Sequence, residues 1–167
     1  MDSPHHGYRL RHGRCSQPHQ RYLITAVTRN RTPCFADIRR ARLLSRNFLE
    51  MDNQGACTTL CFVVMPDHFH WLLDLSGKYS LSQTVGMLKS QTARAIGQSI
   101  WQRGFHDHAL RREEDTLHIA RYIVANPLRA GLVKSIKDYP YWLSLIHISE
   151  PTRRYAIAYA GLWVKKK

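Results

Sequence analysis

Acidic residues are scarce in this chain, and long apolar runs are absent. Its 167 residues include 25 lysines and arginines but only 12 aspartates and glutamates, which gives a net charge of +13 with neutral histidines. The two main apolar runs, residues 60–66 and 69–75, are much shorter than the roughly 20 residues of a membrane-spanning helix. No apolar stretch of the secretory type follows the basic N-terminus, so we expect a cytoplasmic protein without a membrane segment.

Closely spaced cysteine pairs of the kind found in zinc sites are also missing. The four cysteines, Cys15, Cys34, Cys57 and Cys61, form no C-x-x-C pair. In a cytosolic chain such cysteines are expected to be reduced residues of the core or of loops. The sequence therefore predicts neither a disulfide framework nor a cysteine-held zinc ion.

Positive charge is concentrated at the N-terminal end. Positions 1–46 hold ten arginines and two aspartates, a charge of +8. Arginine binds phosphate oxygens in pairs through its planar fork, and each neutralised phosphate releases counterions. The distribution favours a nucleic-acid partner, although solubility alone is another reason for surface charge. We expect residues 1–20 to form an irregular basic arm in which Arg9, Arg11 and Arg14 contact DNA.

An alternation of strand and helix patterns predicts an α+β fold. β-Forming runs occur at residues 22–28, 58–65, 68–75 and 105–111. Helical spacing of apolar residues occurs at 36–51, after Ser80 as an N-cap, and after the acidic cluster at 113–115. This order predicts a ferredoxin/RRM-like antiparallel sheet with helices packed mainly on one face.

Two histidines one residue apart begin the third predicted strand. Because alternate side chains of a strand share a face, His68 and His70 should point one way while Phe69 and Trp71 pack on the other. Two neutral imidazoles with open positions beside them can hold a cation that polarises a phosphate. His-x-His pairs also occur on half-exposed strands that bind no metal, so both interpretations stand on the spacing alone.

Two polar residues lie one turn apart on the last predicted helix. Tyr122 and Asn126 fall at the margin of its apolar face, where a side chain can be positioned by the core and still reach a cleft. The alternative is structural: Tyr122 covers the edge of the core, and Asn126 caps the helix before Pro127.

Three segments, in this order, resemble the single-tyrosine HUH transposases, and most closely the REP-associated tyrosine transposases of bacteria. They are FVVMPDHFHWLL at 62–73, WQRGFHDHALR at 101–111 and ARYIVANPLRAGL at 120–132. The resemblance extends from about residue 14 to residue 142. It implies a bacterial enzyme that acts on single-stranded DNA hairpins as a monomer or a homodimer.

The resemblance also implies a role for each marked residue. His68 and His70 would ligate a divalent cation, Mg²⁺ or Mn²⁺, and Asn126 would supply the third, amide ligand. Tyr122 would be the nucleophile that nicks the strand, leaving a 5′-phosphotyrosine and a free 3′-hydroxyl for strand transfer. That reaction needs no ATP, which agrees with the absence of a G-x-x-x-x-G-K-[ST] loop.

Four further residues are accessory candidates. His106 and His108 share a strand face by the same alternation, and they either position DNA or the ion or are ordinary residues of a polar face. Arg121 and Arg129 flank Tyr122 and either contact phosphate or belong to a solvated helix end.

The sequence predicts one catalytic domain with two flanking segments. We expect the basic arm at 1–20, the HUH domain at 21–142, and a non-native, poorly packed tail at 143–167, because that tail resembles translated sequencing-adapter sequence. The leading function is a transposase. The alternatives are an HUH initiator of replication or plasmid mobilisation, and a non-catalytic RRM-like binder that stacks bases on sheet aromatics.

Overall fold

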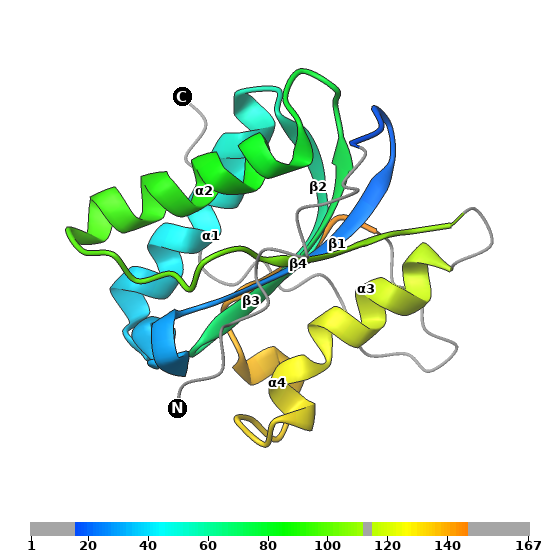
Figure 1. The fold of residues 1–167 in the computed structure, drawn as a ribbon. Coiled ribbons are helices and arrows are strands. Elements are labelled where there is room, and N and C mark those ends of the chain that lie inside the picture. Colours follow the sequence, from blue (N-terminus) through cyan, green and yellow to red (C-terminus); the bar gives the residue numbers. More distant parts are fainter. Residues whose placement is uncertain (1–15, 112–114, 147–167) are drawn as a thin grey trace, which may run out of the picture.

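A five-stranded antiparallel sheet forms the centre of the protein, with helices on both of its faces (Figure 1). The computed structural model describes residues 16–111 and 115–146. The sheet order is β4-β1-β3-β2-β5. The strands are β1 (Arg21–Val27), β2 (Cys57–Met65), β3 (His68–Leu75), β4 (His106–Ala109) and β5 (Trp142–Ser144). The helices are α1 (Ile38–Asn53), α2 (Leu81–Ile96), α3 (Thr116–Val124) and α4 (Asn126–Arg129), with 3-10 turns at Arg29–Arg31, Cys34–Ala36 and Ile136–Asp138.

The hairpin of β2 and β3 is the middle of the sheet. Pro66 and Asp67 link the two strands, and Met65 lies opposite His68 in the register. The hairpin and the start of β3 at His68 are confirmed as predicted. Because β1 pairs with the other edge of β3, the histidine-bearing strand has a hydrogen-bonded neighbour on each side.

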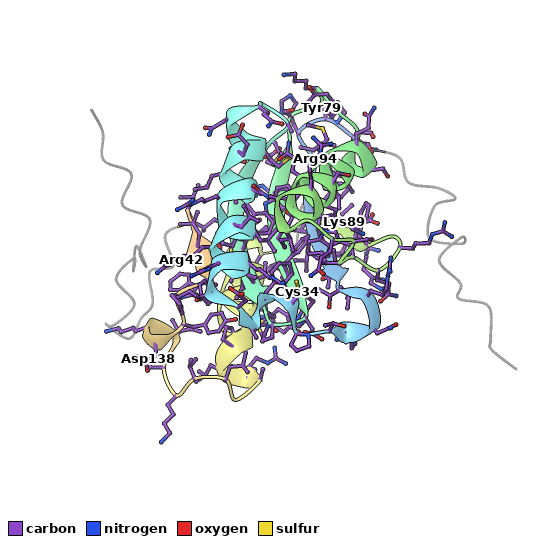
Figure 2. All side chains as sticks on the ribbon, turned by 90° about the vertical axis from the view of Figure 1, so that its left-hand side faces the viewer. Cys34, Arg42, Tyr79, Lys89, Arg94 and Asp138 are labelled. Atoms are coloured by element: carbon purple, nitrogen blue, oxygen red, sulfur yellow. The ribbon has the colours of Figure 1, made fainter. Side chains whose placement is uncertain are left out.

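Helices α1 and α2 lie side by side over one face of the sheet (Figure 2). Asp37 caps α1 by accepting a hydrogen bond of 2.7 Å from the Arg39 amide. Ser80 caps α2 as predicted, in a capping box with Gln83. A hydrogen bond of 2.8 Å from Asn47 Nδ2 to Thr92 Oγ1 joins the two helices directly.

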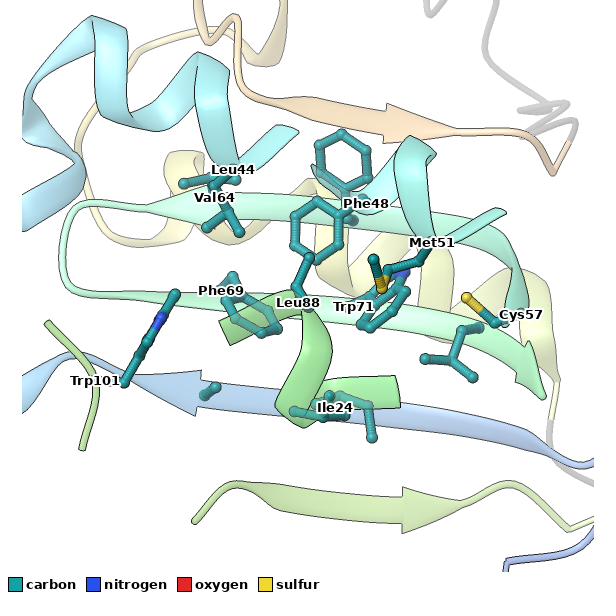
Figure 3. Packing of buried hydrophobic residues seen from close by; sticks show 14 of the residues in the cluster. Ile24, Leu44, Phe48, Met51, Cys57, Val64, Phe69, Trp71, Leu88 and Trp101 are labelled. Carbon is teal, nitrogen blue, oxygen red and sulfur yellow. The ribbon is translucent and has the colours of Figure 1, made fainter. Parts of the chain in front are cut away.

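Aromatic side chains fill the space between these helices and the sheet (Figure 3). The Phe48 ring of α1 stacks on Phe62 at 4.5 Å between centroids and meets Phe69 and Trp71 at 5.2 and 5.0 Å. All four residues are buried, and the Trp71 indole N–H donates to Thr59 Oγ1 at 3.0 Å. This core holds one face of β3 rigid, which fixes the direction of the alternate side chains on the other face.

Helix α3 covers the opposite face of the sheet (Figure 1). Its buried residues Ala120, Ile123 and Val124 belong to a second apolar cluster with Val63 and Leu72 of the central hairpin. The predicted fold class is confirmed: the two long helices pack on one face, and the short α3 packs on the other. The helix that bears Tyr122 therefore lies on the same side of the sheet as His68 and His70.

The sheet continues past the predicted domain boundary at residue 142. Leu143 and Ser144 pair with Phe62 and Cys61 of β2, and the Leu145 amide donates to Leu60 O at 2.9 Å. The expectation that the tail from 143 is poorly packed is therefore wrong for residues 143–146. A three-residue edge strand has too short a pattern to be recognised before its partner is known. Residues 147–167 lie outside the described part of the chain, as do residues 1–15 of the predicted arm.

Within the described segments, no helix has both the length and the apolar character to cross a bilayer.

Candidate metal and nucleophile site

The two histidines of β3 lie together on one face of the sheet. Their ring centroids are 5.0 Å apart, and the ring planes meet at 82°. Both rings are half-buried, whereas Phe69 and Trp71 are 0% exposed on the other face. The predicted alternation is confirmed.

Each imidazole is held through its Nδ1 atom. The Nδ1 of His68 lies 2.6 Å from Asp67 Oδ1, and the Nδ1 of His70 lies 2.8 Å from Thr25 Oγ1. None of the hydrogen bonds found in the described segments uses the Nε2 atom of either ring. Histidines that bind metals usually engage the second ring nitrogen in this way, because the outer hydrogen bond fixes the orientation and the tautomer of the ring. The pair therefore fits a divalent cation bound through Nε2.

The charge states of the groups around His68 and His70 also suit metal binding. Burial, and secondarily the charge of His68, lower the pKa of His70 to about 4, so this ring is neutral at physiological pH. Only a neutral imidazole has the lone pair that a metal requires. Although burial acts to raise the pKa of Asp67, hydrogen bonds from His68 and Arg31 outweigh it, and the pKa of this carboxyl lies below its usual value.

Tyr122 is exposed near the end of α3. Its side chain is 43% accessible, and the guanidinium carbon of Arg129 lies 4.4 Å from the centroid of its ring. No hydrogen bond of the phenol oxygen is present within the described residues. The ring is thus open to a large substrate, and it has a cation, Arg129, over its face.

Asn126 makes the contacts expected of a helix cap. Its Nδ2 donates to the main-chain oxygens of Tyr122 at 3.0 Å and Ile123 at 3.2 Å. Asn126 thus caps the end of α3 through its amide nitrogen, as the structural alternative expects. The amide oxygen Oδ1, the atom a cation would take, has no hydrogen bond in the part of the chain that is described. No contact recorded there joins Asn126 or Tyr122 to either histidine.

Packing nevertheless places α3 next to the histidine pair. Val63 and Met65 of β2 lie opposite His70 and His68 in the strand register, so these four side chains share a face. Val63 and Met65 belong to the same apolar cluster as the buried side of α3. The helix therefore rests on the strand adjacent to the two imidazoles.

The accessory histidines lie on the same face as the pair. In the sheet register His106 is opposite Thr25, and Thr25 is opposite His70, which makes a row across β4, β1 and β3. Two residues further along β4, His108 lies opposite Leu23 of β1, so its side chain is on the same face as that of His106. Both accessory histidines are exposed. Two strand spacings, about 10 Å, separate His106 from His70, so His106 lies beside the site and not inside it.

The predicted arginines are divided between described and undescribed parts of the chain. Arg9, Arg11 and Arg14 lie outside the described residues, Arg121 is half-buried on α3, and Arg129 is exposed on α4. Across residues 16–111 and 115–146, no group of three or more His, Cys, Asp or Glu side chains is placed to hold a metal. A cation on the two imidazoles would need its remaining ligands from an amide, from water or from a substrate phosphate.

Sequence reasoning missed three residues that surround the pair. They are Thr25, Asp67 and Arg31, the last of which donates to Asp67 Oδ2 at 3.0 Å. Asp67 had a local signal, because it directly precedes the first histidine. Thr25 had none, because its partner depends on the register of two strands that are 45 residues apart.

This chain is similar in sequence to known transposases. The family described as "Transposase IS200 like" matches residues 16–126. A protein of Escherichia coli K12 described as a REP-associated tyrosine transposase is 35% identical over 102 residues, which are 60% of this chain and 61% of that protein. A relative from Haemophilus influenzae is 30% identical over 101 residues, covering 50% of this chain and 56% of its own. The chain thus spans about three fifths of the length of the curated relatives it matches.

One solved structure is similar over most of the chain. It is a REP-associated tyrosine transposase bound to a REP hairpin, with a TM-score of 0.68 and 27% identity. The match covers 77% of this chain and 79% of that one.

Proposed function

Because this chain belongs to the IS200-like transposase family, we propose that it nicks and transfers single-stranded DNA at hairpin-forming repeats, through a covalent 5′-phosphotyrosine on Tyr122. The observation that carries this proposal is the pair of imidazoles with engaged Nδ1 atoms, on the sheet face that the Tyr122 helix packs against. The relative whose solved structure holds a REP hairpin supports the class of substrate.

His68 and His70 are the proposed ligands of Mg²⁺ or Mn²⁺ through their Nε2 atoms, and Asn126 is proposed to add Oδ1. Two neutral imidazoles and one amide oxygen suit such cations and leave positions open for substrate oxygens. When bound, the cation supplies Lewis-acid polarisation of a non-bridging phosphate oxygen. The Nδ2 of Asn126 donates to helix carbonyls, which leaves the Oδ1 acceptor available to bind the cation.

Tyr122 is the proposed nucleophile. Its Oη forms a bond to phosphorus as the bond between phosphorus and the 3′ oxygen breaks; the phenol proton is released, and the departing 3′ oxygen is protonated. Since the product is again a phosphodiester, a new 3′-hydroxyl can attack it and restore the strand without ATP. The exposure of the ring allows a DNA strand to reach it.

Basic side chains provide the proposed DNA surface. Arg129 lies over the nucleophile and Arg121 precedes it in the chain, so both are proposed to contact phosphates near the cut. The arginines of the N-terminal arm add phosphate contacts along the strand. His106 and His108, exposed on β4 beside the candidate metal site, are proposed to position DNA rather than the ion.

An RRM-like binder without catalysis is less well supported. Such proteins stack bases on aromatic residues exposed on their sheet. The sheet aromatics Phe69 and Trp71 are fully buried beneath α1 and α2, so they present no stacking surface.

The test is a denaturing gel of the protein with labelled single-stranded hairpin oligonucleotides and Mn²⁺. We expect a covalent adduct that disappears in Tyr122→Phe while hairpin binding remains. Tyr79→Phe is the matched control, because Lys78 lies 5.3 Å over the Tyr79 ring much as Arg129 lies over Tyr122. An undiminished adduct in Tyr122→Phe contradicts the mechanism.

A further inference from the structure

A chain of polar contacts connects the loop after β1 to the first histidine. Arg31 donates from a terminal guanidinium nitrogen to Asp67 Oδ2 at 3.0 Å, and Asp67 Oδ1 lies 2.6 Å from His68 Nδ1. The two carboxylate oxygens therefore serve different partners. Asp67 bridges an arginine of the loop and an imidazole of the candidate metal site.

This arrangement dictates the tautomer of His68. An ionised carboxylate has no proton to donate, so the Nδ1 of His68 must carry the hydrogen of this bond. In the neutral ring the lone pair then resides on Nε2, the atom that a cation would use. Arg31, by occupying the second oxygen, limits the ways in which the carboxylate can turn.

The backbone of the loop is constrained at the same place. Asn30 and Arg31 adopt positive φ angles of 54° and 51°, a left-handed conformation that non-glycine residues seldom take. The Thr28 amide donates to Asp67 O at 2.8 Å, and the Thr28 hydroxyl lies 2.9 Å from the same oxygen. These contacts tie the loop to the main chain of Asp67 without using its carboxylate. Strained residues of this kind persist where the surroundings fix them, and they are common at functional sites.

We propose that Asp67 and Arg31 are positioning residues for metal binding: Arg31 holds the Asp67 carboxylate, and the carboxylate holds His68 in the tautomer and orientation that present Nε2 to the cation. This inference rests on the proposed function, because it assigns His68 as a ligand. It differs from a purely structural ion pair, which at a surface adds little to stability and has no effect on an imidazole tautomer.

The test compares Asp67→Ala with the wild-type full-length chain. The substitution keeps the main-chain oxygen that Thr28 binds, so the loop retains its anchor. The first readout is ¹⁵N-histidine NMR of the metal-free protein at mildly alkaline pH. We expect His68 to be the Nδ1–H tautomer in the wild type and a mixture of tautomers in Asp67→Ala.

The second readout is binding of Mn²⁺ alone, followed by electron paramagnetic resonance. Loss of an outer partner of a metal-bound histidine lowers affinity by about 10–100-fold, and we expect Asp67→Ala to fall in that range. Arg31→Met, which leaves the carboxylate in place, should lower the affinity less and in the same direction. This second variant keeps the test valid if Asp67→Ala does not fold.

Asp74→Ala is the matched control. Asp74 lies at the far end of β3 and pairs with Arg21 at 3.9 Å, so its removal deletes an aspartate–arginine pair that touches no histidine. The tautomer and the affinity for Mn²⁺ should both stay as in the wild type. An Asp67→Ala protein with the wild-type tautomer and affinity overturns the inference alone, and so does an equal loss in Asp74→Ala. A wild-type protein that binds no Mn²⁺ overturns the proposed function together with the inference.

Discussion

The guanidinium of Arg129 lies over the ring of Tyr122, with 4.4 Å between the guanidinium carbon and the ring centroid. The two residues are on successive helices, and both are exposed. A cation over an aromatic ring attracts it, by about 0.5–1 kcal/mol at exposed sites. The contact orients the proposed nucleophile and places a positive charge where a phosphate would approach.

Removing this cation should slow adduct formation. We expect Arg129→Ala to lower the rate of Tyr122 phosphotyrosine formation about tenfold, because the ring loses its orienting contact and the phosphate loses a neighbouring charge. The measurement is single-turnover kinetics on denaturing gels. Lys78→Ala, which removes the cation from the Tyr79 ring, should react at the wild-type rate. Equal rates for Arg129→Ala and the wild type would show that Arg129 plays no part in the reaction.

The two imidazoles should account for the binding of metal. His70→Gln should abolish detectable binding of Mn²⁺ in calorimetry, because one of two nitrogen ligands is lost. His106→Gln is the matched control: this histidine lies on the same sheet face, with Thr25 between it and His70. It should retain wild-type affinity for Mn²⁺ and bind the hairpin more weakly. Retained binding in His70→Gln would contradict the assigned site.

Thr25 should act on His70 as Asp67 acts on His68. Thr25→Val keeps the shape of the side chain and removes the hydroxyl that lies 2.8 Å from His70 Nδ1. We expect about a tenfold loss of affinity for Mn²⁺ and about 1 kcal/mol of lost stability in urea unfolding. Thr58→Val, at an exposed position of strand β2, should change neither quantity.

Lys89 of α2 contacts the segment that leads into β4. Its ammonium donates to Gln102 O at 2.8 Å and to Gly104 O at 2.7 Å, and it lies near the Trp101 ring. Figure 2 shows Lys89 on the same helix as Arg94. Through these two hydrogen bonds Lys89 links α2 to the segment that leads into β4. Its partial burial lowers the pKa of the amine to about 8.

The lowered pKa predicts a pH-dependent contribution to stability. Between about pH 8 and pH 10 the unfolded chain keeps the Lys89 proton that the folded chain has lost, so this residue makes folding more favourable as the pH rises. Relative to Lys89→Met, the wild type should gain about 1 kcal/mol over that interval, a figure that allows for solvent screening. Urea unfolding at a series of pH values measures the difference. Arg94→Met, on the exposed side of the helix, should show no such trend, and a flat difference for Lys89→Met would contradict the prediction.

The last strand should contribute to stability. A chain ending at residue 142 loses the pairing of Leu143 and Ser144 with β2 and the bond from the Leu145 amide, whereas a chain ending at residue 146 keeps them. We expect the shorter chain to be less stable by about 2 kcal/mol in urea unfolding, since each lost hydrogen bond costs about 1 kcal/mol. Equal stabilities would show that β5 contributes nothing to the fold.

Local patterns in the sequence predicted much of the fold and part of the site. Ser80 and Gln83 form the capping box that begins α2, and the alternation through His68 and His70 fixes which side chains share a face. Such features depend on neighbours within a few residues along the chain, which is why sequence periodicity reveals them.

The rest depended on contacts between distant segments. The bond between Thr25 and His70 follows from the pairing of β1 with β3, and the bond between Arg31 and Asp67 follows from a loop folded beside the hairpin turn. β5 is a strand because β2 offers it an edge, not because of its own composition. The sequence pattern of α2 does not show that Lys89 is partly buried, because its partners are main-chain oxygens of the loop at 102–104.

In the proposed mechanism Tyr122 becomes covalently joined to DNA with the help of the two imidazoles. Mass spectrometry of peptides from the protein, after incubation with a hairpin oligonucleotide and Mn²⁺, tests it most directly. We predict a phosphonucleotide on the peptide that contains Tyr122, dependent on Mn²⁺ and absent from His68→Gln and His70→Gln. A nucleotide attached to any other residue, or cleavage of the hairpin with no nucleotide attached to the protein, would contradict the account.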